Sequence, residues 1–177
     1  MNDYLHLSEE GSPYVIELNA ALLPRLTADI AIGAQAGHEI GGLLLGTLPR
    51  STGVTLRIED YLAFERPANK EARYVLTAEQ RAGLSSQRRR LLERGTEVFG
   101  FFRSHLRRDA LGLREDDRKL LEKEFGRALH TALVIRARAP YTGGFVFPDV
   151  QSAGKIGKRA QFQCEELARM AVKIKQA

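Results

Sequence analysis

The sequence predicts an α+β domain in which a mostly antiparallel sheet is flanked by helices. The first observation is the order of hydrophobic patterns along the chain: strand, helix, two strands, helix, strand, helix, two strands, helix. The second is length, because 177 residues suit one domain with an appended element. The third is composition, since 44% hydrophobic and 28% charged residues are ordinary values for a globular chain.

The first half of the chain carries the patterns of three strands and one helix. Residues 14–18 show a weak alternation of polar and apolar side chains that favours a strand. Residues 20–36 carry an apolar stripe at helical spacing, and Gly37 suits the end of that helix. The apolar run at residues 40–48 predicts a buried strand, and residues 54–64 predict a strand antiparallel to it.

The second half begins with a polar loop that contains Pro67. A helix follows, with a capping-box pattern of Thr77 and Gln80 at its start and an end near Arg94. The sequence then predicts a strand, a helix, two strands and a final amphipathic helix. The expected ranges of these elements are residues 98–104, 114–129, 131–136, 145–147 and 158–175.

Cysteine content and the apolar pattern narrow the class of protein. Cys164 is the only cysteine, which excludes an internal disulfide framework and a cysteine-rich zinc cluster. No apolar run approaches the ~18 residues that span a bilayer. Residues 1–13 read as an acidic tail without the pattern of a signal peptide. We therefore expect a cytoplasmic protein without a membrane partner.

The net charge of +5 is accompanied by basic clusters at residues 88–90, 107–108 and 155–159. Such clusters can bind phosphate groups, but they more often form a solvated helix face or loop. Aromatic side chains that could stack on bases are not interleaved with them. A nucleic-acid-binding protein is therefore the weakest of the functions that we weigh.

Two segments carry the chemistry that the sequence offers. The first is GHEIGGLLLG at residues 37–46, and the second is EVFGFFRSHLRRDALGLRED at residues 97–116. Together they resemble the JAB/MPN domain (JAMM-like, Mov34/PAD-1 family), the fold of the JAMM zinc isopeptidases, in a bacterial-type form. The resemblance covers about residues 14–150 and implies the cytidine-deaminase-like architecture of that family.

The resemblance also implies roles for individual residues. Glu39 matches the general base that acts on a zinc-bound water, and His105 and Asp116 match two zinc ligands. Arg103 stands in place of the first metal-binding histidine, and Leu113 in place of the serine that donates to the oxyanion. Arginine has no lone pair to give a metal, and leucine has no donor. These departures predict impaired catalysis and no tightly bound zinc.

Arg103 can also be assigned a function in the site. Without a metal, Glu39 and Asp116 would repel each other in one pocket, and a guanidinium is a planar fork that suits carboxylates. We interpret Arg103 as a substitute for the metal charge, on the same strand face as His105; the alternative is an arginine that points to solvent. Family spacing selects Asp116, whereas helical periodicity places Asp117 nearer the apolar stripe of its helix.

Two main functional hypotheses follow. The first is a protein-interaction or scaffold module of residues 14–150, with residues 151–177 as an amphipathic helix that packs on a partner or a second copy. The alternative is a zinc-dependent isopeptidase or peptidase with an altered metal site. The resemblance implies that such an enzyme acts on ubiquitin-like or carrier-protein conjugates, and a ubiquitin-like protein is therefore among the expected partners.

Overall fold

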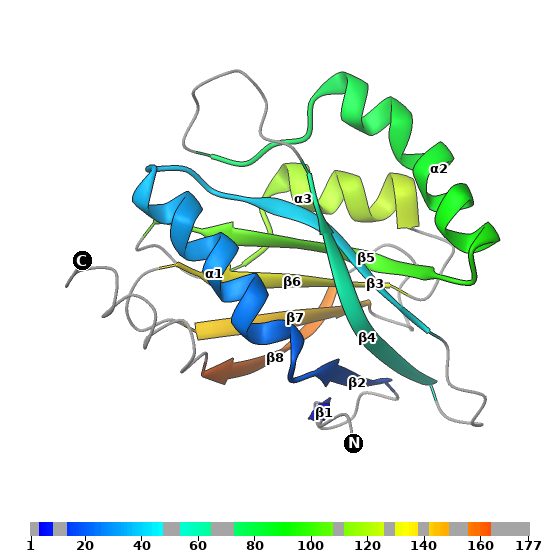
Figure 1. Cartoon of the computed structure of the whole chain (residues 1–177), viewed down its shortest axis with the longest axis horizontal. Helices are drawn as coiled ribbons and strands as arrows, with labels where there is room; N and C mark the ends of the chain where they lie inside the picture. Colours follow the sequence, from blue (N-terminus) through cyan, green and yellow to red (C-terminus); the bar gives the residue numbers. More distant parts are fainter. Residues whose placement is uncertain are drawn as a thin grey trace.

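The protein has an α+β fold, as the sequence predicts (Figure 1). The computed structural model describes residues 4–8, 14–47, 54–64, 73–107, 112–125, 130–137, 142–148 and 156–163. In chain order the elements are β1 (Tyr4–Ser8), β2 (Tyr14–Asn19), α1 (Leu22–Gln35), β3 (Gly41–Thr47), β4 (Val54–Ala63), α2 (Ala78–Glu93), β5 (Glu97–His105), α3 (Glu115–Leu120), the π turn η1 (Leu121–Phe125), β6 (Thr131–Arg136), β7 (Thr142–Pro148) and β8 (Ile156–Gln163).

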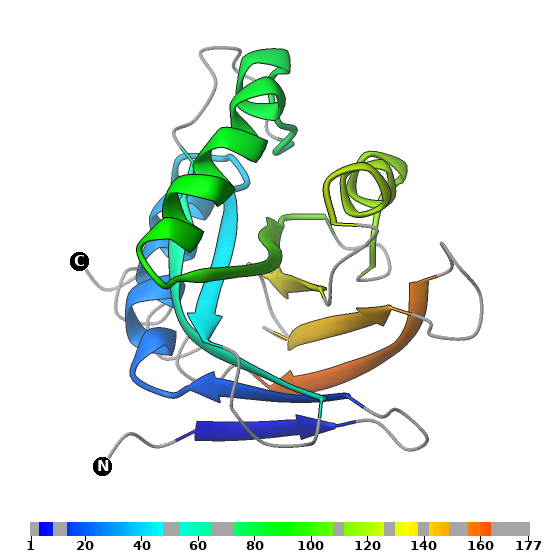
Figure 2. The same ribbon diagram turned by 90° about the vertical axis from the view of Figure 1, so that its right-hand side faces the viewer.

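The strands form one mixed sheet of eight strands in the order β1-β2-β4-β3-β5-β6-β7-β8. The β2–β4 and β5–β6 pairs are parallel, and the other neighbours are antiparallel. Figure 2 shows that the sheet is strongly curled, so that its two ends approach each other. Strands β3 and β5 lie at the centre, which places the two motif segments side by side.

Alternation along the central strands separates two apolar cores, one on each face of the sheet. On one face, α1 packs its buried stripe, which includes Leu26 and Ile30, against Leu44 and Phe102 of the sheet. On the other face, Phe101 packs with side chains from α2 and η1. That second core consists of Leu43, Leu45, Leu84, Val98, Phe101, Leu121, Phe125 and Ala132.

The helix boundaries follow the local signals in the sequence. Helix α1 is followed by Gly37 at φ 75°, a left-handed position that glycine adopts without strain. Helix α2 begins with the expected capping box, in which Gln80 N donates to Thr77 Oγ1 and Thr77 N donates to Gln80 Oε1. Over the described part of the chain, no helix is both long enough and apolar enough to cross a bilayer.

Both ends of the sheet differ from the sequence prediction. Strand β1 replaces part of the expected tail, because Leu7 packs on the core and Tyr4 Oη donates to Glu59 at 2.7 Å. Strand β8 replaces the start of the expected C-terminal helix, because the edge of β7 offers it a row of backbone partners. The sheet thus extends beyond residues 14–150 in both directions, and residues 164–177 lie outside the described residues.

The helix expected over residues 114–129 is also modified. Helix α3 begins at Glu115 and passes after Leu120 into the π turn η1, which ends at Phe125. The π turn buries Leu121 and Phe125 in the second core. Residues 126–129 lie outside the described part of the chain.

Candidate functional site

The candidate site forms where the end of β5 meets the segment that precedes β3. Alternation along β5 sends Arg103 and His105 to one face and Ser104 to the other, and each of the three is at most 2% exposed. Ser104 fixes this junction, because its Oγ accepts a hydrogen bond from Ile40 N and its N–H donates to Ile40 O, both at 2.8 Å. These two bonds hold Glu39 beside His105.

Arg103 is the centre of the site and is only 1% exposed. Its guanidinium forms a fork on the Asp117 carboxylate, with Nη2–Oδ2 at 2.8 Å and Nε–Oδ2 at 3.1 Å. The remaining N–H groups face the carbonyl oxygens of Gly112 at 3.0 Å and Ser104 at 3.2 Å, and Nδ1 of His105 at 3.3 Å. A buried guanidinium is tolerated when its charge and its donors are matched in this way.

The carboxylate that binds Arg103 belongs to Asp117, and the expected pairing of Arg103 with Asp116 is wrong. The Asp117 side chain is 9% exposed, and it also accepts a hydrogen bond from Arg114 N at 2.8 Å at the start of α3. The Asp116 side chain is 49% exposed and pairs with Arg73 at 2.7 Å. Asp117 is the residue that helical periodicity selects.

Glu39 is buried next to this pair and accepts three hydrogen bonds. Arg114 Nη2 lies 2.5 Å from Oε1, Leu106 N lies 3.2 Å from the same oxygen, and Tyr74 N lies 3.1 Å from Oε2. Burial alone raises the pKa of Glu39, but the hydrogen bond and charge of Arg114 and the two backbone N–H groups outweigh it, so the pKa is lowered. Glu39 is therefore held ionised and is a weak base.

His105 faces two arginines through the same ring nitrogen. Its Nδ1 lies 3.3 Å from Arg103 Nη1, 3.4 Å from Arg114 Nη2 and 3.8 Å from Glu39 Oε1. A guanidinium can only donate hydrogen bonds, so Nδ1 acts as the acceptor. The lone pair of this nitrogen is thus directed at the guanidinium groups.

The structure adds Arg114 to the site. Arg114 reaches Glu39 and His105 from the residue that precedes α3. Leu113 is half-buried and packs against the second core. Periodicity identifies Asp117, but no signal in the sequence marks Arg114, because an arginine before a helix is usually solvated.

These residues do not fit a zinc ion. Arg103 and Arg114 balance the charges of Glu39 and Asp117, and a hydrolytic zinc site needs three ligands that converge on one open position. The oxygens of both carboxylates and Nδ1 of His105 already accept hydrogen bonds, from arginines or from backbone N–H groups. Among the residues that the structure describes, no three His, Cys, Asp or Glu side chains form a group that could hold a metal ion.

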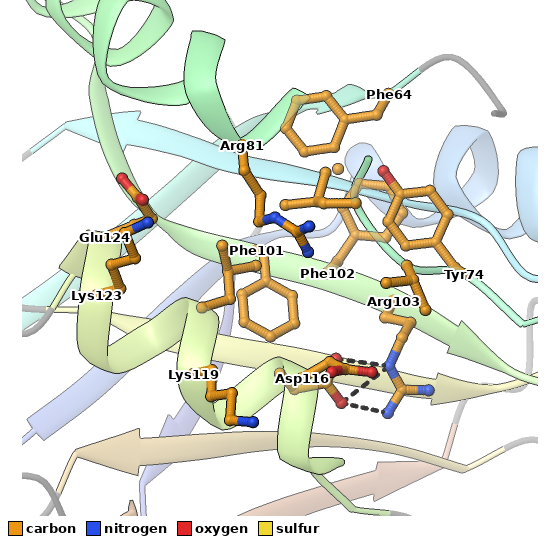
Figure 3. Close-up of a pocket in the computed structure, with 15 residues that line it drawn as sticks. Phe64, Tyr74, Arg81, Phe101, Phe102, Arg103, Asp116, Lys119, Lys123 and Glu124 are labelled. Carbon is orange, nitrogen blue, oxygen red and sulfur yellow. Dashed lines mark hydrogen bonds and ion pairs between the residues drawn. The ribbon is translucent and has the colours of Figure 1, made fainter. Parts of the chain in front are cut away.

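A pocket of about 240 Å³ opens beside Arg103, between α2, α3 and β5 (Figure 3). Its walls are mainly apolar and include Phe64, Tyr74 and Phe101, while Arg103 lies at one end. The Tyr74 ring comes so close to Gly41 that a Cβ there would lie 2.6 Å from it, so the glycine permits this approach.

Known proteins resemble this chain in structure. No protein-family model and no curated protein matches its sequence. The solution structure of protein DSY2949 from Desulfitobacterium hafniense is similar with a TM-score of 0.52 and 18% identity, over 81% of this chain and 90% of that one. A protein from Salinibacter ruber is similar with a TM-score of 0.49 and 18% identity, over 80% of this chain and 86% of that one. The first likeness shows a common α+β fold and nothing about activity.

Proposed function

We propose that this chain is a JAB/MPN-like domain whose metal site has become an arginine–carboxylate network, and that it acts as a protein-interaction or scaffold module. The observation that carries the proposal is the buried Arg103, which binds Asp117 and contacts His105 where the family resemblance requires a zinc ligand. A fixed guanidinium there supplies the positive charge of a metal without its Lewis acidity.

The positions around Arg103 support the same proposal. Glu39 and His105 keep the identities and the proximity expected of the family base and the second family histidine. After His105 the chain is one residue out of step with the family spacing: Asp117 takes the place expected for Asp116, and Arg114 faces the site where Leu113 was expected. This shift leaves the acidic helix residue in place but adds a second cation.

Each element of hydrolysis is weakened in such a site. Nδ1 of His105 and oxygens of Glu39 and Asp117 accept hydrogen bonds from arginines, and the lowered pKa of Glu39 makes it a poor acceptor of a proton. The same bonds join β5, the segment before β3 and the start of α3 into one rigid unit. Rigidity of this kind suits a binding surface that is formed before the partner arrives.

Zinc binding distinguishes this proposal from the alternative, a zinc-dependent isopeptidase or peptidase, which the proximity of Glu39 and His105 favours. We expect calorimetric titration with zinc to show no site in the wild-type protein. Arg103→His combined with Arg114→Ser removes both cations and offers a third ligand, so we expect one site in this variant. Arg90→His, which changes an exposed arginine of α2 outside the site, serves as the control.

The results of the zinc titrations distinguish the two functions. One zinc per wild-type chain that is lost in His105→Ala, together with cleavage of an isopeptide-linked substrate, would establish the enzyme and overturn the scaffold proposal. If the double variant also fails to bind zinc while it remains folded, the correspondence of His105 and Asp117 with family ligands is wrong.

A further inference from the structure

The pocket beside Arg103 has an apolar floor that the ion-pair network does not use. It is lined by Phe64, which follows β4, by Phe101 of β5 and Leu120 of α3, and also by Tyr74 and Leu76. An apolar lining in a concave site commonly marks a binding position.

The rim of the pocket is basic. Arg81 of α2, Lys119 of α3 and Lys123 of η1 line it, and all three are exposed. Figure 3 shows the Arg81 side chain extending from α2 toward Phe101. No hydrogen bond or ion pair connects this guanidinium to another side chain of the described residues, so its charge is available to a ligand.

Acidic residues cancel only part of this charge: Lys119 pairs with Glu115 at 3.7 Å in an exposed ion pair, and Glu124 also lines the pocket. Asp117 is paired with Arg103, and Asp116 is paired with Arg73. Glu124 lies farther along the rim, where its carboxylate accepts a hydrogen bond from Ser85. The pocket therefore combines an apolar floor with a net positive rim, which is complementary to an apolar group flanked by negative charges.

Volume decides between a small ligand and a peptide side chain. A space of about 240 Å³ is below the roughly 300–1,000 Å³ of sites that enclose drug-sized ligands. It suits one large side chain, and a single buried aromatic anchor commonly dominates the affinity of a protein interface.

We infer that the pocket between α2 and α3 docks a partner-protein segment that has one aromatic anchor flanked by aspartate or glutamate. The anchor lies on Phe101 and Leu120, and the flanking carboxylates bind Arg81 and the two lysines. This inference rests on the proposed function, since it gives the interaction module its recognition site. The buried Arg103–Asp117 pair forms the rigid end wall of that site.

The probe is a blocked peptide, acetyl-Asp-Glu-Phe-Glu-Asp-amide, added to the full-length ¹⁵N-labelled protein in a nuclear magnetic resonance titration. We expect saturable shifts of the Leu76, Phe101 and Leu120 amide signals. Arg81→Glu should weaken binding about tenfold, because an attraction becomes a repulsion. Arg89→Glu makes the same charge change on an exposed part of α2 away from this pocket, and we expect it to weaken binding less than about threefold.

Three results would overturn the inference. The first is equal binding of a peptide with alanine in place of phenylalanine, and the second is equal binding of a peptide with lysine in place of the acidic residues. The third is saturable binding of 3-phenylpropionate without binding of the peptide, which would make the pocket a small-molecule site. None of these results changes the zinc titration, so a failure here is distinct from a failure of the proposed function.

Discussion

A guanidinium that is 1% exposed is stable inside a protein only when its charge and its N–H groups are matched. Arg103 meets this condition through Asp117, two carbonyl oxygens and His105. Of the two adjacent aspartates, the one that pairs with it is Asp117, which helical periodicity favours, and not Asp116, which the family spacing selects. Arg103 is thus part of the fold as well as of the site.

Removal of the Arg103 side chain should strongly destabilise the protein. Arg103→Ala leaves Asp117 buried without its partner, and breaking one side of a buried ion pair costs about 3–5 kcal/mol. Arg73→Ala breaks the exposed pair with Asp116 and should cost about 0–1 kcal/mol. Urea unfolding at neutral pH measures both losses. Equal losses of unfolding free energy in the two variants would show that the buried Arg103–Asp117 pair stabilises the fold no more than the exposed pair does.

Arg114 controls the ionisation of Glu39, and this gives the stability a pH dependence. The folded pKa of Glu39 is lowered, so its stabilising contribution is present above the unfolded value of about 4.3 and is lost as pH falls through the folded value. Arg114→Met removes the hydrogen bond and charge that oppose burial, so the pKa should rise. The difference in unfolding free energy between wild type and variant should therefore grow from pH 3 to pH 7.

Two measurements check this expectation. The pKa of Glu39 is read from the ¹³C chemical shift of its carboxyl carbon during a pH titration, and urea unfolding gives the free energies. A difference between the proteins that stays constant with pH would mean that Arg114 stabilises the fold through packing alone.

At the scale of elements, β5 depends on a glycine that the sequence does not single out. Gly100 has φ 140° where the register between β3 and β5 shifts, and a Cβ there would collide with the Thr131 carbonyl oxygen of β6. Gly100→Ala should destabilise the fold by at least about 1–3 kcal/mol, the usual cost of a backbone conformation that L-residues avoid. Gly83→Ala, in open space on α2, should instead stabilise it by about 0.5–1 kcal/mol.

Thermal unfolding of the two alanine variants tests the point directly. A melting temperature for Gly100→Ala at or above that of the wild type would show that β5 can move away from β6 at this position without loss.

The sequence predicts elements well where local chemistry defines them. The capping box of Thr77 and Gln80 and the stop at Gly37 mark helix ends by themselves. Strand β8 was missed because its identity depends on the free edge of β7, which no local pattern reveals. The same reason explains Arg114: the length of the connection after His105, and not a residue pattern, decides that its side chain reaches Glu39 and His105.

At the scale of the whole molecule, the site joins distant parts of the chain. Glu39 precedes β3, Arg103 lies near the end of β5, and Asp117 belongs to α3, so the bonds of Arg114 to Glu39 and of Arg103 to Asp117 form only when the central sheet and α3 are assembled. Because these two bonds join residues 75 and 14 positions apart in the sequence, we infer that the network stabilises the assembled tertiary structure and not any single element.

The last prediction concerns the sheet edge at β8. A chain that ends after Pro148 loses β8 and leaves unpaired the backbone groups of β7 that face it, while the other edge of β7 stays paired with β6. Each backbone hydrogen bond makes a net contribution of about 0.5–1.5 kcal/mol, so the free energy of unfolding should fall by a few kcal/mol. The exposed strand edge should also promote self-association. A chain that ends after Gln163 keeps β8 and serves as the control. Urea unfolding and light scattering measure the two effects, which should appear only in the shorter chain. If removal of residues 164–177 alone changes the assembly state, association depends on the C-terminal segment, as the sequence hypothesis holds, and not on the edge of β7.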